Sequence, residues 1–586
     1  MNAIALPLLL LLSDPAPDQR PRPEPATTLH ALFREAWEFR LREDPLLATA
    51  VGDPRGADRL PSVKPADLER RAMATRDYLA RLKKIDPAHL ARQDRISYHM
   101  FARELGDDLA EHEFGAYRLP LTADWGFHIG IAQLPSQVPL ATTRDYENYL
   151  ARLRAVPAYF ADHIALLREG LRTGFTLPRA VLSGYDGTIR AQVVEDPEKS
   201  VFMRPFQSFP IGVPETDRPR FREAGRAAIT EAVVPAYRAF LDFMVREYLP
   251  EARQTLGASE LPRGREYYAH RVKSFTTLEV TPREVHEIGV REVARIREEM
   301  EAVRRQVGFE GALPAFLQDL RRDPRFYAKT PEELLKEASF IAKKMDGQLP
   351  RLFGKLPRLP YGVEPVPADL APKFTGGRYV EAPIGSTRAG TYWVNTYALD
   401  KRPLYVLEAL TLHEAVPGHH LQIALQQELA DLPEFRRVSG VAAFVEGWAL
   451  YAERLGLEAG FYRNPYSNFG RLTYEMWRAC RLVVDTGLHE SGWSRQQTMD
   501  FLAQHTALSL HEIETETDRY ISWPGQALAY KMGELRLREL RTKAELALGA
   551  RFDVRRFHDA VLANGPVPLS ILEAEIDAFI AAERKP

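Results

Sequence analysis

The chain has 586 residues, 45% of them hydrophobic and 27% charged, so it falls within the ordinary globular range and not that of disordered or fibrous proteins. Its 78 basic and 80 acidic side chains leave a formal charge of -2, which excludes a general binder of nucleic acids or anionic membranes. The single cysteine, Cys480, excludes an intramolecular disulfide and a thiolate metal cluster, so a metal site would have to use His and carboxylate ligands.

The first segment of the chain is an apolar run of about ten residues, Ala3 to Leu12. This is the length of a signal-peptide core and is too short to span a bilayer as a helix. Asp18 to Pro25 is Pro-rich and extended in character. We therefore expect residues 1–25 to be a signal peptide and tether, and the mature protein to be periplasmic or secreted, with the cytoplasm as the alternative. No later run approaches 18 apolar residues, so no integral membrane segment is expected in the mature chain.

Helical patterns dominate the rest of the chain. From about 28 to 249, apolar residues recur at the 3.6-residue spacing of a helix. The longest non-helical stretch, 374–397, contains two β-rich runs, Arg378 to Val380 and Thr391 to Val394, which predict a small antiparallel sheet. Helical patterns resume at 404 and continue to the end. The sequence thus predicts a mainly α protein with one small sheet directly before its most informative segment.

That segment is HEAVPGHH, residues 413–420, where a His-Glu pair is followed closely by two further histidines. In the zinc motif HExxH, two His four residues apart on one helical face bind the ion, and the Glu acts as general base. Catalytic zinc takes three protein ligands and keeps one position for water. The pattern predicts His413 as a ligand of Zn²⁺ and Glu414 as the base.

The second ligand is less direct, because the spacing departs from HExxH. On an unbroken helix, the residue six positions after His413 would point about 120° away from it. Pro417 lacks the N–H that would bind the His413 carbonyl, so we expect the helix to bulge or kink at Pro417-Gly418. Treating those two residues as an insertion makes His419 the second ligand, with His420 as the alternative. A helix end with surface histidines is the competing interpretation.

A third ligand is predicted on the helix at about 441–457. Glu446 lies there among apolar residues, 27 residues after His419. A buried carboxylate costs several kcal/mol unless it is paired or bound to a metal, so Glu446 is the predicted third ligand, with an arginine partner as the alternative. Glu453 falls on the same helical face and would orient a ligand from behind, or would itself pair with an arginine.

The motifs HEAVPGHHLQ (413–422) and FVEGWALYAE (444–453) resemble the gluzincin metallopeptidases and, more closely, the bacterial domain-of-unknown-function 885 family. The resemblance covers most of the chain, from 33–53 to 518–540. It implies a large two-lobed helical metallopeptidase-like fold with a deep central groove. Residues 26–586 would form one domain, with lobes at about 26–270 and 271–586.

The same resemblance suggests further site residues in and beside DRYISWPGQALAY (518–530). Helical gluzincins place groups that stabilise an oxyanion in this region, which makes Tyr530, and after it Tyr520, catalytic candidates. Arg519 or Lys531 would bind a substrate carboxylate. The alternative for each is a packing or surface role. The strand Thr391 to Tyr397 would offer an edge to an extended peptide.

The expected function is that of a zinc-dependent peptidase, a carboxypeptidase or dipeptidase acting on short peptides. Two alternatives stay open: a metal-dependent hydrolase of another amide or ester, and a non-catalytic peptide-binding or export-associated scaffold. The chain has no G-x-S-x-G elbow, Walker motif or dinucleotide glycine fingerprint, which disfavours a serine hydrolase, an NTPase and a nucleotide-dependent oxidoreductase.

Overall fold

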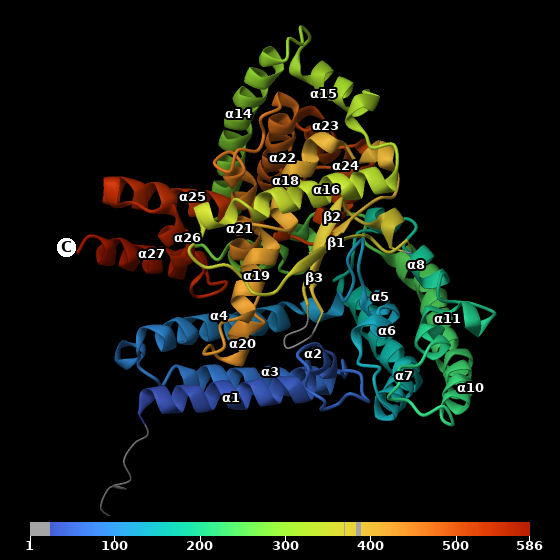
Figure 1. Ribbon diagram of the computed structural model, residues 1–586. Coiled ribbons are helices and arrows are strands. Elements are labelled where there is room, and N and C mark those ends of the chain that lie inside the picture. Colours follow the sequence, from blue (N-terminus) through green and yellow to red (C-terminus); the bar gives the residue numbers. More distant parts are fainter. Residues whose placement is uncertain (1–23, 369, 383–387, 586) are drawn as a thin grey trace, which may run out of the picture.

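The computed structural model describes residues 24–585 except 369 and 383–387, so most of the predicted signal peptide and tether lies outside the described residues. The first helices form a layer at the base of the view in Figure 1. They are α1 (Pro25–Glu43), α2 (Pro45–Ala50), α3 (Pro65–Leu82) and α4 (Arg92–Phe114). Pro begins α1, α2 and α3, where a missing N–H costs nothing because no partner exists for it within the helix.

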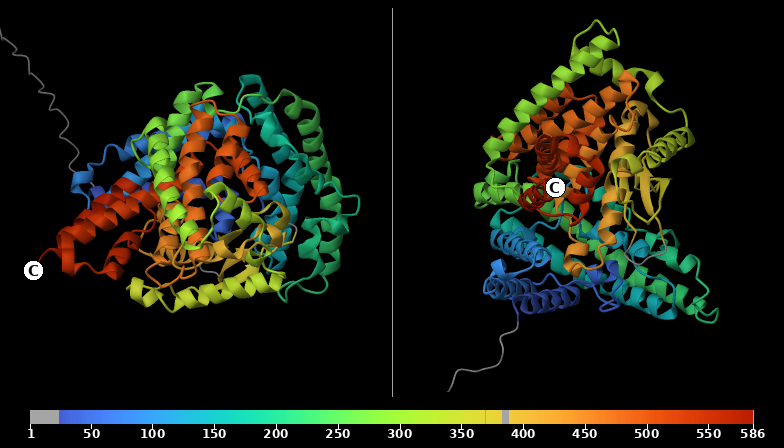
Figure 2. Two further views of the ribbon diagram at one scale, coloured as in Figure 1. Left: turned by 90° about the horizontal axis from the view of Figure 1, so that it is seen from above. Right: turned by 60° about the vertical axis from the view of Figure 1, so that its left-hand side comes forward.

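A second group of helices continues this layer on the side away from the C-terminus (Figure 2). It consists of α5 (Phe127–Ala132), α6 (Leu134–Gln137), α7 (Thr143–Thr173), α8 (Asp186–Arg190), α9 (Arg204–Gln207), α10 (Arg218–Ala228), α11 (Val234–Phe243) and α12 (Leu249–Glu251). A capping box between Thr142 and Asp145 starts the long helix α7.

Most of the remaining helices build the body above the base layer, while the short helix Glu434–Arg437 reaches down to α1 in that layer (Figure 1). Before the site these are α13 (Gly264–Thr276), α14 (Pro282–Gln306), α15 (Leu313–Arg322), α16 (Pro331–Asp346) and α17 (Leu349–Leu352). After the sheet come α18 (Leu407–Glu414), α19 (His419–Gln427), α20 (Glu434–Arg437), α21 (Ala442–Leu455), α22 (Pro465–His489), α23 (Arg495–His505), α24 (Leu510–Ser522), α25 (Ala529–Leu548), α26 (Val554–Leu562) and α27 (Leu569–Glu583).

Two helix pairs form the centre of the body. Every residue of α22 from Phe469 to His489 is buried, and α14 packs along this helix. The helix predicted at 441–457 is α21, and it packs along α25 with the two backbones in close contact at Gly447 and Gly533. A connected cluster of buried apolar side chains extends from α1 to α27. The predicted lobe boundary at 270/271 falls inside α13, whose residues on both sides of it share one apolar cluster.

The sheet differs from the prediction because it has a further strand. Among the described residues its strands are β1 (Tyr361–Pro365), β2 (Gly377–Val380) and β3 (Gly390–Val394), in the order β1-β3-β2. β2 and β3 are antiparallel as predicted, but β1 pairs with β3 in parallel. The prediction that the strand at 391–397 offers a free edge is therefore wrong, since both edges of β3 are already paired. β1 lies in a Pro-rich segment of the chain, which has no strong β pattern.

No described helix is both long enough and apolar enough to cross a membrane.

Candidate metal centre

The helix that carries His413 ends one residue after it, at Glu414. The chain then passes through Ala415 to Gly418, with a cis peptide bond before Pro417, and starts α19 at His419. The sequence predicted a bulge or kink within one helix, whereas the structure has two helices separated by a turn. The buried indole of Trp448 on α21 donates a hydrogen bond from Nε1 to the Pro417 carbonyl at 2.8 Å, which ties the turn to the Glu446 helix.

Gly418 is required by this turn. A Cβ at this position would lie 1.9 Å from the His413 carbonyl oxygen and 2.5 Å from that of Leu412. Both contacts are with backbone, which cannot move aside as a flexible side chain can. The absence of a side chain at Gly418 therefore lets α19 begin close enough to α18 for His419 to turn back towards His413.

Three side chains meet at this point. His413, His419 and Glu446 each offer a ligand atom, and these atoms lie within 4.8 Å of one another. Glu446 Oε2 is 3.7 Å from His413 Nε2 and 3.5 Å from His419 Nε2. Two ligands at about 2.1 Å from a tetrahedral ion would lie about 3.4 Å apart, so the spacing suits a single bound zinc.

The electrostatics of the cluster favour a charged carboxylate. Burial raises the pKa of Glu446, but His413 and His419 lower it further, and the net result is well below the ordinary value. Burial lowers the pKa of His413, while Glu446, Glu453 and Glu414 raise it, to about 10 overall. The centre is thus a place where acidic groups strongly favour a positive charge, whether a proton or a metal ion.

Glu453 lies behind the first histidine. Its Oε1 is 2.8 Å from His413 Nδ1, and Arg478 from α22 lies 3.4 Å from the same carboxylate oxygen. Both predicted alternatives for Glu453, orienting a ligand and pairing with an arginine, are therefore present together. A carboxylate at Nδ1 fixes the imidazole so that Nε2 faces the Glu446 side of the site.

The neighbouring histidine, His420, points elsewhere. Its Nδ1 is 3.0 Å from the Tyr379 hydroxyl, and its ring packs against Tyr361 at a centroid distance of 4.5 Å. Burial lowers its pKa to about 4, so it is a neutral, packed side chain. The structure therefore brings His419, and not His420, to His413 and Glu446.

This difference gives a direct test. If the centre binds zinc, His419→Ala is expected to remove it, because this change deletes one of the three predicted ligands, while His420→Ala is expected to retain it. Zinc content after gel filtration in zinc-free buffer measures both, with circular dichroism as a check on folding. Equal zinc loss in the two variants, with folding intact, would contradict the assignment.

Glu414 follows His413 at the end of α18 and is 8% exposed. Its Oε2 accepts a hydrogen bond from the backbone N–H of Tyr379 on β2 at 2.8 Å. The sheet that precedes the motif in sequence thus holds the predicted base in space. The order β1-β3-β2 makes β2 the strand beside α18.

The predicted helpers of catalysis separate into two kinds. The Tyr520 hydroxyl is buried and accepts hydrogen bonds from Trp477 Nε1 at 2.8 Å and Arg481 Nε at 2.9 Å, so it has a structural role. The Tyr530 hydroxyl accepts a hydrogen bond from Arg519 at 3.2 Å. Tyr530 lies one turn before Gly533, where α25 touches the Glu446 helix, and its catalytic role stays a prediction.

The prediction that Lys531 binds substrate is wrong. Its ammonium group is fully buried, at 3.1 Å from Glu292, 3.0 Å from Glu475 and 2.9 Å from Glu534. Burial lowers its pKa, but the three carboxylates raise it above the ordinary value, so it stays charged inside the protein. Arg519 is also engaged within the protein, with Gln526, Glu516 and Tyr530. Side-chain burial of this kind depends on α14 and α22, which the local sequence does not reveal.

Lys531→Met is therefore expected to destabilise the fold without changing the cluster of His413, His419 and Glu446. Removing one partner of a buried ion pair typically costs about 3–5 kcal/mol, because the remaining charges stay buried without compensation. Lys543→Met on the same helix is the matched control, since Lys543 is 45% exposed and pairs with Asp577 at the surface. The midpoint of thermal unfolding should fall by several degrees for the first variant and hardly change for the second. Equal midpoints would contradict the structural role.

Sequence reasoning missed the residues that support the centre. Trp448 is one of the apolar neighbours of Glu446 in the sequence, and its indole N–H binds the turn at Pro417. Tyr379 acts through its backbone and Arg478 through a contact from another helix, so neither had a local pattern to mark it. The sequence did contain one usable indication, since the β-rich run at Tyr379 directly precedes the motif.

Comparisons with known proteins agree with this fold. The profile of a family described as bacterial protein of unknown function (DUF885) matches residues 45–576. The chain belongs to this family. A comparison with curated proteins found no match.

Two solved structures are similar over nearly the whole chain. One is described as a candidate lipoprotein from Colwellia psychrerythraea, with 27% identity and a TM-score of 0.89, covering 95% of this chain and 100% of that one. The other, a candidate lipoprotein of unknown function from Shewanella oneidensis, is 18% identical with a TM-score of 0.71, covering 94% of this chain and 99% of that one. The second likeness concerns the fold alone.

Proposed function

We propose that this DUF885 protein is a zinc-dependent hydrolase that cleaves peptide bonds in short peptides, acting as a carboxypeptidase or dipeptidase of gluzincin type. The observation that carries the proposal is the convergence of His413, His419 and Glu446 from three helices on one point. Two imidazoles and a carboxylate are the ligand set of catalytic zinc sites that keep a position open for water.

The residues present fit such an ion. Glu446 Oε2 is buried and has no hydrogen-bond partner among the described residues, although two imidazole nitrogens lie within 3.7 Å of it. An unpaired buried carboxylate oxygen is costly, and a cation held jointly with the two imidazoles would remove that cost. When bound, zinc would polarise the scissile carbonyl and lower the pKa of a water molecule.

The roles of the chain's own groups follow from their contacts. Glu414 would accept a proton from water and pass it to the leaving amine, with the Tyr379 N–H holding its carboxylate in position. Glu453 would hold the proton of His413 at Nδ1 and keep Nε2 free as a ligand. Tyr530 would donate its hydroxyl proton to the developing oxyanion.

The substrate and compartment belong to the same proposal. The near-neutral charge suits a peptide substrate better than a nucleic acid. The two similar structures are described as candidate lipoproteins, which supports a periplasmic or secreted location for this chain. The proposed groove would run between two lobes with the centre at its floor.

Metal analysis of the purified protein, together with mass spectrometry of a peptide mixture incubated with it, tests the proposal. We expect one zinc per chain and the appearance of shortened peptides that disappears with chelator and returns with zinc. Zinc that neither co-purifies nor reconstitutes would reject the metal centre. Bound zinc with an untouched peptide mixture would reject the peptidase and favour another amide or ester, or a peptide-binding scaffold.

A further inference from the structure

A cavity of about 720 Å³ lies beside the first half of α18. Its walls come from α15, α22, α23 and α24, from the segment at 400–403, from Gly376 just before β2 and from Val394 at the end of β3. The volume is within the range of about 300–1,000 Å³ typical of sites for small ligands. None of its lining residues has a role in the metal centre described above.

The cavity and the metal centre lie along the same helix, α18. Leu410 lines the cavity, and His413 and Glu414 follow it by three and four residues, so all three lie on one helical face. Three residues of helix correspond to about 4.5 Å of rise. Strand β2 runs beside this face: a Cβ on Gly377 would lie 3.4 Å from Leu410, and the Tyr379 N–H binds Glu414. Helix α18 thus carries both a wall residue of the cavity and the proposed base.

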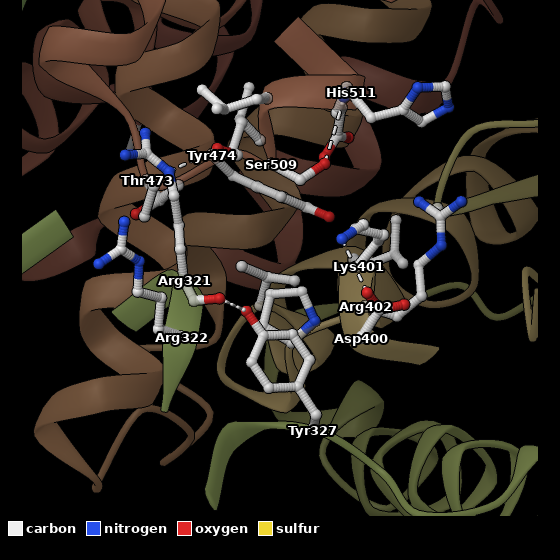
Figure 3. Close-up of a pocket in the computed structure, with 18 of the residues that line it drawn as sticks. Arg321, Arg322, Tyr327, Asp400, Lys401, Arg402, Thr473, Tyr474, Ser509 and His511 are labelled. Carbon is white, nitrogen blue, oxygen red and sulfur yellow. Dashed lines mark hydrogen bonds and ion pairs between the residues drawn. The ribbon is translucent and has the colours of Figure 1, made fainter. Parts of the chain in front are cut away.

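Two polar atoms of residues in the cavity wall have no hydrogen-bond partner among the described residues. Thr473 Oγ1 and Arg402 Nε are buried and have no hydrogen-bond partner in the part of the chain that the structure describes. The Tyr474 side chain is 5% exposed, and Figure 3 shows it extending into the space bordered by Lys401, Arg402 and Tyr327. Buried polar groups normally find partners, so these groups indicate a ligand that supplies them.

The basic side chains of the cavity indicate a negative charge on that ligand, and one of them stands out. Arg321 is occupied by the backbone carbonyls of 503, 506 and 508. Lys401 pairs with Asp400 at 2.7 Å, and Arg322 is exposed at the outer rim. Arg402 makes one long hydrogen bond, to the Phe374 carbonyl at 3.4 Å. Its guanidinium is the group best suited to bind a carboxylate in two places.

Three acidic residues line the cavity, Asp400, Asp500 and Glu512, and a charged Glu512 would repel such a ligand. Burial raises its pKa to about 7, with Glu516 acting in the same direction and Arg402, Arg478 and Arg481 acting against. Near neutral pH a large share of this carboxyl is therefore protonated, and it would then donate a hydrogen bond instead of repelling an anion. The cavity is compatible with a bound carboxylate on this count too.

We propose that this cavity receives the C-terminal end of a short peptide and that Arg402 and the Tyr474 hydroxyl bind its terminal carboxylate. The inference rests on the proposed peptidase function and names its substrate class, which is short peptides with a free C-terminus. The cut would fall where the chain of such a peptide, anchored in the cavity, passes along β2 to Glu414.

The test measures binding, so that it does not depend on turnover. Isothermal titration of the purified Glu414→Gln protein compares Ala-Phe-Leu as free acid with the same peptide as C-terminal amide. Hydrogen bonds to a charged group contribute about 1.5–3 kcal/mol, so the free acid should bind about 10- to 100-fold more tightly. Arg402→Gln should remove most of the preference for the free acid and leave the affinity for the amide unchanged.

Matched variants separate a binding role from a structural one. Arg322→Gln at the rim should keep the preference for the free acid. Tyr474→Phe removes only a hydroxyl and should lower the affinity for the free acid several-fold without changing that for the amide. This variant keeps the test valid if Arg402→Gln fails to fold. If either residue had only a structural role, its substitution would lower the affinity for both peptides equally.

Four results would overturn the proposal. The first is equal affinity for the free acid and the amide of Ala-Phe-Leu, and the second is a preference for the free acid that survives both Arg402→Gln and Tyr474→Phe. The third is an affinity for Ala-Phe-Glu amide that equals that for Ala-Phe-Leu free acid, and the fourth is that N-acetylation weakens binding while amidation does not. The third would assign the cavity to a side-chain carboxylate and the fourth to an amino group at Glu512. Failure of the peptidase is seen separately, as absence of cleavage by the wild type.

Discussion

Glu446→Gln is expected to lower the affinity for zinc by more than about 100-fold, since changes to groups that merely support a ligand already cost about 10- to 100-fold. The amide has nearly the same shape as the carboxylate, so packing on α21 is preserved. What is lost is the negative charge beside His413 and His419, at 3.7 and 3.5 Å. Competition with a fluorescent chelator measures the change.

Two further variants calibrate this result. Glu453→Gln acts through His413 and should cost about 10- to 100-fold in zinc affinity. Glu434→Gln changes an exposed carboxylate on α20 and should cost nothing. A Glu446→Gln protein that holds zinc as tightly as the wild type would remove Glu446 from the ligand set. The buried Glu446 carboxylate oxygen, which has no hydrogen-bond partner among the described residues, would then have no explanation.

Glu414→Gln is expected to reduce kcat by about 100- to 10,000-fold while zinc content stays at one per chain, because a positioned general base contributes about that factor. Glutamine can still accept the hydrogen bond from Tyr379 N–H, so the turn at the end of α18 should be maintained. Single-turnover cleavage of a short peptide, with zinc measured on the same sample, tests both halves of the statement.

Zinc content and cleavage, measured together, decide which role Glu414 has. Loss of zinc together with activity would give Glu414 a structural or ligand role and contradict its assignment as base. Full activity with zinc bound would place the base elsewhere. Glu434→Gln again serves as the control, with unchanged kcat.

How much of the site the sequence predicts depends on how local each feature is. His413 and Glu414 are adjacent, and Glu446 stands out as a single acid in an apolar helix, so composition and spacing identify them. The mainly helical fold follows from periodicity for the same reason. The sequence favours His419 over His420 but does not decide between them, since the choice depends on the direction of the chain after the turn at Gly418.

Features that depend on distant segments escaped the sequence. The sequence predicts that Lys531 binds substrate, whereas in the structure Glu292 from α14 and Glu475 from α22 bind its ammonium group. The edge of β3 seemed free until β1 paired with it. In both cases the partner belongs to another secondary-structure element, and periodicity and motifs do not say which elements pack together.

The sequence by itself determined the chemistry available to this protein: near-neutral charge, one cysteine, and a His-Glu motif with a carboxylate on the next long helix. The tertiary structure decided which of these groups meet. Gly418 against the His413 carbonyl and Trp448 on the Pro417 carbonyl turn His419 inwards, while His420 is held by Tyr379. The physical reason is that a residue's type and helical face are local properties, whereas the direction of a side chain after a helix break is set by the backbone packing around it.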